Sequence, residues 1–178
     1  VRWRFAKLEA DHYELAAYYR GSAGALENAA RACTGALATI PADEPSATRA
    51  AAQTGLAAIL ALLGERDQEP ARFELAAQLL ADAHTYYDEA LPNSEAWIRA
   101  VTLRADVLTR LGELHQSRDI LEQAAVIYQS LITSGQPGHQ SVTAAGTHLR
   151  TRLALALFSF IALQGGAEPS EAAMTTID

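Results

Sequence analysis

The chain has 178 residues, of which 49% are hydrophobic and 20% charged, a balance typical of a globular protein. Its formal charge of -7 would repel a phosphate backbone, which argues against nucleic-acid binding by the surface as a whole. The single cysteine excludes an intramolecular disulfide, and no signal-like segment opens the chain, so we expect a cytoplasmic location. The chain begins at Val1 without a methionine, and we expect it to be a fragment of a larger protein.

Alanine and leucine dominate the composition, whereas β-branched and aromatic residues are sparse, so we predict an all-α protein without strands. The longest apolar run, Leu153 to Leu163, is interrupted by Ser159 and is far shorter than the roughly 20 residues that span a bilayer. We therefore expect this run to belong to a core rather than to a membrane.

Apolar residues recur at steps of three and four along most of the chain, the period of a helix with one apolar face. The prolines all fall between or at the start of the resulting segments. In chain order, the predicted helices cover residues 3–19, 22–39, 46–63, 70–90, 94–111, 117–133 and 141–164, with a partial eighth beginning at Ser170. Gly64 and Gly112 are expected at helix ends, where a left-handed capping residue is favourable.

The chain contains an internal repeat. The segments "LENAARACTGAL" from Leu26, "FELAAQLLADAH" from Phe73 and "LEQAAVIYQSLI" from Leu121 superimpose, and their starts lie 47 and then 48 residues apart. "LLGE" from Leu62 and "RLGE" from Arg110 precede the last two of them at the same offset. The repeating unit is therefore a helix pair, with repeats near 3–40, 46–91, 94–134 and 141–178.

Four sets of residues occupy the signature spacings of a known repeat family. They are Ala10, Tyr13, Ser22, Leu26 and Ala29 in the first unit, Ala57, Leu60, Gly64, Phe73 and Ala76 in the second, Ala105, Leu108, Gly112, Ser117, Leu121 and Ala124 in the third, and Phe158, Gly165 and Ser170 in the fourth. In this pattern the chain resembles the tetratricopeptide repeat (TPR) family. Its long period is similar to that of the arrays attached to bacterial signalling ATPases, transcription activators and caspase-like proteases.

The resemblance implies one TPR-like domain over residues 1–178, a right-handed α-solenoid of about 3.5 repeats and seven to eight helices. It also implies a regulatory role through protein binding, with a peptide or partner domain held on the concave face. On this basis we expect a protein-interaction scaffold within a larger bacterial protein and not an enzyme.

No residue pattern in the sequence points to catalysis, a cofactor or a metal. Cys33 aligns with Leu80 and Tyr128 of the other repeats, which predicts a core position. The histidines lack the spacing of paired metal ligands; His84 and Asp88, four residues apart, are expected to form a surface contact. No glycine-rich phosphate loop or nucleophile elbow occurs.

The concave surface that the resemblance implies carries more basic than acidic residues. The candidate partner-binding residues are Arg4, Lys7, Arg99, Thr102, Asp106, Arg110 and Arg152. Because guanidinium groups suit carboxylates, we expect an acidic segment of a protein or peptide to bind there. Tyr86 and Trp97 are candidate aromatic anchors, whereas Tyr87 and Tyr128 are expected in the core.

The predicted helix 141–164 is apolar nearly all round, so we expect it to be buried on two sides, by a further repeat or by a homodimer contact through the C-terminal helices. The alternative class is a small-molecule-sensing or enzymatic helical bundle. Its apolar pocket would be lined by Tyr13, Tyr18, Tyr19 or Phe158.

Overall fold

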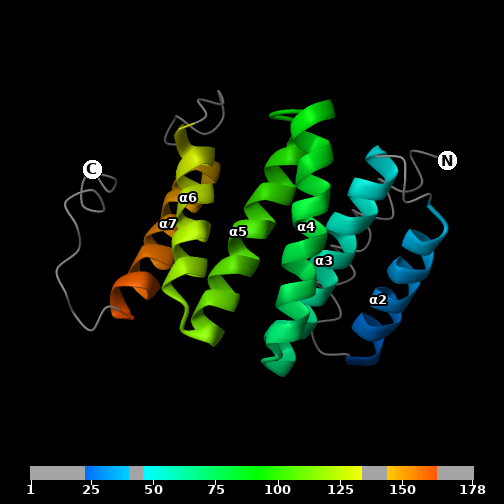
Figure 1. The fold of residues 1–178 in the computed structure, drawn as a ribbon, viewed down its shortest axis with the longest axis horizontal. Coiled ribbons are helices and arrows are strands. Elements are labelled where there is room, and N and C mark those ends of the chain that lie inside the picture. The colour runs from blue at the N-terminus through cyan, green and yellow to red at the C-terminus, as the bar shows by residue number, and fades with distance from the viewer. Residues whose placement is uncertain (1–22, 41–45, 134–143, 164–178) are drawn as a thin grey trace. The chain divides into compact units, whose positions relative to one another are not determined.

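The computed structural model describes residues 23–40, 46–133 and 144–163 (Figure 1). Every regular element in these ranges is an α-helix, and none is a strand, which confirms the all-α class. The helices are α2 (Ala23–Ala38), α3 (Ala47–Asp67), α4 (Pro70–Ala90), α5 (Glu95–His115), α6 (Arg118–Thr133) and α7 (Ala144–Ala162). The helices predicted over 3–19 and from Ser170 lie outside the described residues.

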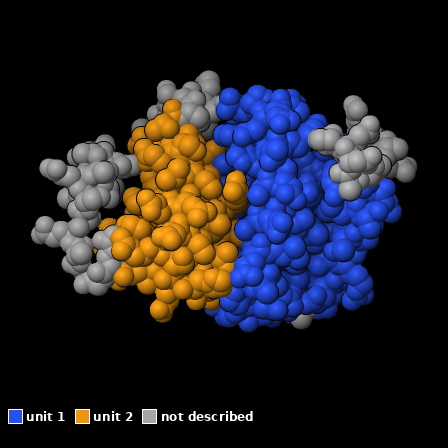
Figure 2. All heavy atoms as spheres, viewed as in Figure 1, with its two compact units in different colours: residues 1–103 blue, residues 104–178 orange. Residues whose placement is uncertain are grey.

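The chain divides into two compact units, residues 1–103 and residues 104–178 (Figure 2). The division falls inside α5. In unit 1, α3 contacts both α2 and α4, and in unit 2, α6 contacts α7.

Two helices begin at serine caps that occupy matching positions in the repeat. The Ser46 hydroxyl accepts a hydrogen bond from the Arg49 backbone N–H at 3.1 Å, and the Ser94 hydroxyl accepts one from the Trp97 N–H at the same distance. Each cap satisfies a donor that the first turn of a helix would otherwise leave unpaired. The two caps lie 48 residues apart, the spacing of the repeat.

The predicted helix ends at residues 63 and 111 are wrong, because α3 and α5 continue to Asp67 and His115. The left-handed residues are Gln68 and Gln116, with φ of 53° and 51°, and not the glycines. Gly64 and Gly112 lie one turn earlier, inside the helices. Their carbonyls accept the N–H groups of Glu69 at 3.2 Å and Ser117 at 2.9 Å, which close the two helix ends in the same way.

Close packing is the reason for glycine at these two positions. A Cβ on Gly64 would lie 2.8 Å from Cε2 of Phe73, and a Cβ on Gly112 would lie 2.7 Å from Cγ of Leu121. Carbon atoms in contact need about 3.5 Å. The missing side chains let α4 approach α3 and α6 approach α5 directly after each turn.

The cores follow the predicted apolar stripes. In unit 1, Leu26 and Cys33 of α2 pack with Leu56, Ile59 and Leu63 of α3. The buried residues of α4 are spaced at three and four: Phe73, Ala76, Leu80, Ala83 and Tyr87. Those of α6 repeat this spacing in unit 2: Leu121, Ala124, Ala125, Tyr128 and Leu131. The predicted burial of Cys33, Tyr87 and Tyr128 is confirmed.

In the part of the chain that the structure describes, α3 is long and apolar enough to cross a membrane by length and composition. Of its most apolar stretch, 61% is buried inside the protein. A helix at the centre of a core passes the same test.

Candidate functional site

The predicted partner-binding residues are distributed over both units. Arg4 and Lys7 lie outside the described residues. Arg99 and Thr102 belong to the part of α5 in unit 1, and Asp106 and Arg110 to the part in unit 2. Arg152 lies on α7. The structure brings Asp106 and Arg152 together.

Asp106 is the centre of a polar cluster that joins three helices of unit 2. The Arg152 guanidinium of α7 donates to one of its carboxylate oxygens, and the Tyr128 hydroxyl of α6 donates to the other. Tyr128 is buried, and this burial, followed by the charge of Asp106 and the hydrogen bond to it, raises the pKa of the phenol. The hydroxyl therefore stays protonated and remains a donor to the carboxylate.

A second polar cluster lies two helical turns further along α5. Glu113 accepts hydrogen bonds from Arg110 of the same helix and from the Ser159 hydroxyl of α7, the latter at 2.8 Å. Asp106 and Glu113 thus each meet a residue of α7 that lies 46 positions later in the chain. Two contacts with the same offset mean that α5 and α7 run in the same direction within unit 2.

The three described arginines of the predicted surface all contact carboxylates of their own chain. Arg152 is paired with Asp106, Arg110 with Glu113, and Arg99 donates to Glu95 at 3.2 Å. In unit 2 these pairs balance two positive against two negative charges. An acidic ligand would have to exchange an existing ion pair for each new one.

Glu95 and Glu113 are functional neighbours that the sequence reasoning missed. Glu95 precedes Arg99 by four residues and Glu113 follows Arg110 by three. At these spacings the two members of each pair are neighbours on the helix surface. This spacing was the available signal. The pairing of Asp106 with Tyr128 and Arg152 had no such signal, because it depends on how three helices pack.

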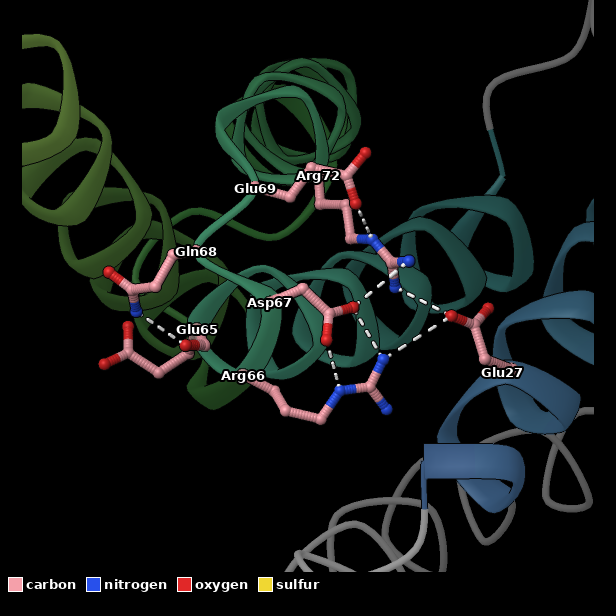
Figure 3. Close-up of polar contacts among 7 residues, drawn as sticks. All are labelled: Glu27, Glu65, Arg66, Asp67, Gln68, Glu69 and Arg72. Atoms are coloured by element: carbon pink, nitrogen blue, oxygen red, sulfur yellow. Dashed lines mark hydrogen bonds and ion pairs between the residues drawn. The ribbon is translucent and has the colours of Figure 1, made fainter.

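Unit 1 has its own ion-pair network at the turn between α3 and α4 (Figure 3). Glu27 of α2 accepts from Arg72 of α4 at 3.0 Å and lies 3.7 Å from Arg66 of α3. Asp67 accepts two hydrogen bonds from Arg66, at 2.5 and 2.6 Å, and lies 3.3 Å from Arg72. Arg72 also donates to Glu69 at 2.6 Å. The network links α2, α3 and α4.

The two aromatic anchor candidates, Tyr86 and Trp97, differ in their surroundings. The Trp97 indole N–H donates to the Asp88 carboxylate at 2.6 Å, and its ring lies 6.1 Å from the His84 ring. His84 is also 3.3 Å from Asp88, so the predicted surface contact between these two residues is confirmed. Tyr86 stacks edge-on against Tyr87 and lines a groove between α3 and α4.

The structure also locates the residues considered for chemistry. Cys33 is buried in unit 1, and burial raises the pKa of its thiol, which lowers the fraction of reactive thiolate. Within the described ranges, no group of three or more His, Cys, Asp or Glu side chains could hold a metal ion. Phe158, one candidate for lining an apolar pocket, is 71% exposed. Tyr13, Tyr18 and Tyr19 lie outside the described residues.

The fold and these surfaces define the class as an all-α protein whose helices follow an internal repeat. Comparisons with family models, with curated proteins and with solved structures found no match for the chain.

Proposed function

We propose that this chain is a protein-interaction scaffold, an α-solenoid of TPR-like helix pairs that serves as a regulatory or sensor module of a larger bacterial protein in the cytoplasm. The observation that carries the proposal is the recurrence of specific contacts, not only of residue types, at one spacing. Such recurrence is typical of arrays in which each helix pair buries its neighbour's apolar face and the stack offers an extended binding surface.

Three structural features recur 48 residues apart. They are the serine caps at Ser46 and Ser94, the close approaches of Phe73 to Gly64 and of Leu121 to Gly112, and the left-handed residues Gln68 and Gln116. The parallel direction of α5 and α7 in unit 2 supports the same arrangement, because equivalent helices of successive repeats run the same way.

The proposed ligand is an acidic segment, and the proposed partner-binding residues are Arg4, Lys7, Arg99, Thr102, Asp106, Arg110 and Arg152. The ion pairs of Arg99 and Arg110 join residues of one helix and are partly exposed, so a carboxylate-bearing ligand could replace Glu95 or Glu113 at low cost. Arg152 is held by Asp106, which also accepts from Tyr128, and contributes less.

The direct test is a titration of the labelled chain with acidic, neutral and basic peptides of equal length, followed by fluorescence anisotropy. We expect the acidic peptide to bind most tightly. Arg99→Glu should weaken this binding, because it replaces a guanidinium with a carboxylate, which repels the peptide. Glu122→Gln, an exposed change on α6, serves as the control. Equal binding of the acidic peptide to wild type and Arg99→Glu would refute this surface.

One face of α7 supports a homodimer through the C-terminal helices. Leu155 and Phe158 are 60% and 71% exposed, whereas Phe160 of the same helix lies under the Arg118 guanidinium at 5.1 Å. Adjacent exposed apolar side chains of this size favour coverage by protein. Light scattering should give the mass of a dimer for wild type and of a monomer for the double variant Leu155→Glu, Phe158→Glu. A monomeric wild type at all concentrations would refute the dimer.

A further inference from the structure

A groove in unit 1 lies between the N-terminal half of α3 and the C-terminal half of α4. Its volume is about 250 Å³. The side chains that matter for its chemistry are Arg49 and Gln53 on α3 and Asp82, Thr85, Tyr86 and Glu89 on α4. Ligand pockets for whole small molecules usually enclose about 300 to 1,000 Å³, so this groove suits a single side chain better.

Gln53 is the unusual residue of the groove. The residue is only 5% exposed, yet in the described part of the chain its side chain makes a single hydrogen bond, from Nε2 to the Asp82 carboxylate at 3.5 Å. This distance is at the outer limit of a hydrogen bond. A primary amide offers two donors and one acceptor, and burying it without partners costs free energy. The amide therefore has unused capacity, its carbonyl oxygen above all.

The next repeat does not contain this polar residue. The position 48 residues later holds Val101, which is buried like Gln53. The matching positions of Arg49 and Asp82 hold Trp97 and Ser130. The helix pair packs without a buried amide or a carboxylate at these positions, so neither group is a requirement of the repeat.

The charge of the groove favours a cation. Asp82 and Glu89 are seven residues apart on α4 and therefore share a helix face, and Thr85 and Tyr86 lie between them. The lining also contains the guanidinium of Arg49, which donates to the carbonyl of Ile40 at 3.1 Å. Two carboxylates, an amide carbonyl and an aromatic ring suit a guanidinium, because this group donates to acceptors in its plane and stacks on aromatic rings.

We propose that this groove binds the side chain of an arginine from a partner polypeptide. The guanidinium donates to the Asp82 carboxylate and to the Gln53 carbonyl, lies against the Tyr86 ring and is attracted by Glu89. Only the polypeptide origin of the arginine rests on the proposed scaffold function. The recognition of the guanidinium rests on the groove.

The test uses N-acetyl-arginine-amide as the probe and two-dimensional NMR of the isotope-labelled full chain as the readout. We expect saturable shifts confined to the backbone amides of residues 49–53 and 82–89, with a dissociation constant on the order of 1 mM for one side chain. N-acetyl-lysine-amide should bind more weakly, because an ammonium lacks the planar fork of donors, and N-acetyl-glutamine-amide should not bind.

Two variants probe the groove and one serves as a matched control. Asp82→Asn should weaken binding of the arginine probe about tenfold, since it removes a charged acceptor. Gln53→Val introduces the residue of the next repeat, so it should keep the fold and still weaken binding. Asp119→Asn, an exposed change on α6, should leave the affinity unchanged.

Absent, non-saturable or scattered shifts would overturn the proposal, as would equal affinity of wild type and Asp82→Asn. Equal affinity for the arginine and lysine probes would overturn its guanidinium specificity. A chain that binds the arginine probe but no peptide would contradict the scaffold function and retain the groove. A chain that binds acidic peptides through Arg99 but not the arginine probe would support the scaffold function and overturn the groove.

Discussion

The second and third repeats agree in their close apolar contacts and differ in their polar ones. Phe73 lies closely against Gly64 in the second repeat, just as Leu121 lies closely against Gly112 in the third. In contrast, Asp106 and Tyr128, which form a cluster with Arg152, correspond to Ala58 and Leu80. The polar residues of unit 1 instead gather at the turn after α3 and in the groove around Gln53.

This difference indicates a division of roles. Two helices can pack this closely only if the residue between them has a small side chain, so glycine occurs at the same position in both repeats. Polar side chains need particular partners, and these differ with the neighbouring helices. The repeated contacts therefore define the helix pair, and the residues that depart from the repeat are the candidates for recognition.

Leu121→Ala should give the largest effect. Leu121 is fully buried against Gly112, where no Cβ fills the space, so truncation leaves a cavity and we expect a loss of about 2 to 5 kcal/mol in the free energy of unfolding. Urea denaturation monitored by circular dichroism measures it. Val126→Ala on the same helix, where the valine is 62% exposed, should change stability by less than about 0.5 kcal/mol. Similar losses of stability for both variants would show that the contact of Leu121 with Gly112 contributes no more than an exposed side chain does.

Gly112→Ala tests the close approach from the other side. The added Cβ would meet Leu121 at 2.7 Å, so despite the better helix propensity of alanine we expect a loss of about 1 to 3 kcal/mol. Gly55→Ala is the matched control, since a Cβ added to this α3 glycine would meet no atom within 4 Å, and it should gain about 0.5 to 1 kcal/mol. Thermal unfolding should show a lower stability than wild type for Gly112→Ala and a higher one for Gly55→Ala. A gain in stability for both variants would contradict the packing role of Gly112.

Asp106→Ala examines the polar difference between the repeats. It leaves the buried Tyr128 hydroxyl without its acceptor, and we expect a loss of about 1 to 3 kcal/mol. The double variant Asp106→Ala, Tyr128→Leu introduces the pair found at the matching positions of the second repeat. It should lose less than the sum of the two single changes in a double-mutant cycle. Strict additivity would mean that the two side chains do not interact.

Asp67→Asn should give the smallest effect, because the network at the end of α3 is exposed to solvent. Hydrogen bonds from Arg66 lower the pKa of the Asp67 carboxyl. A lowered pKa contributes stability above the unfolded value, near pH 3.9, and this stability is lost as the pH falls through the folded pKa. The difference in Tm between wild type and variant should therefore be largest near pH 7 and shrink in acid and in high salt. A difference that does not depend on pH would exclude this carboxylate as the cause.

Helix positions were largely predictable from the sequence. The steps of three and four in α4 and α6 and the prolines between helices placed most boundaries within a few residues. The errors at Gly64 and Gly112 have one cause: glycine near the end of an apolar pattern suggests a cap. Only the distance to Phe73 or Leu121, on the next helix, reveals a packing role.

The candidate site was predictable only in part, since residue spacing within one helix reveals Arg99 with Glu95 and Arg110 with Glu113 but not the partners of Asp106. The sequence by itself determined the all-α class and the helix-pair repeat of 47 to 48 residues, because both follow from local periodicity and recurrence. Tertiary structure alone decided which carboxylate meets Arg152, why glycine precedes each turn, and that Gln53 is buried beside Asp82. These features depend on contacts between helices far apart in the chain, which no local pattern encodes.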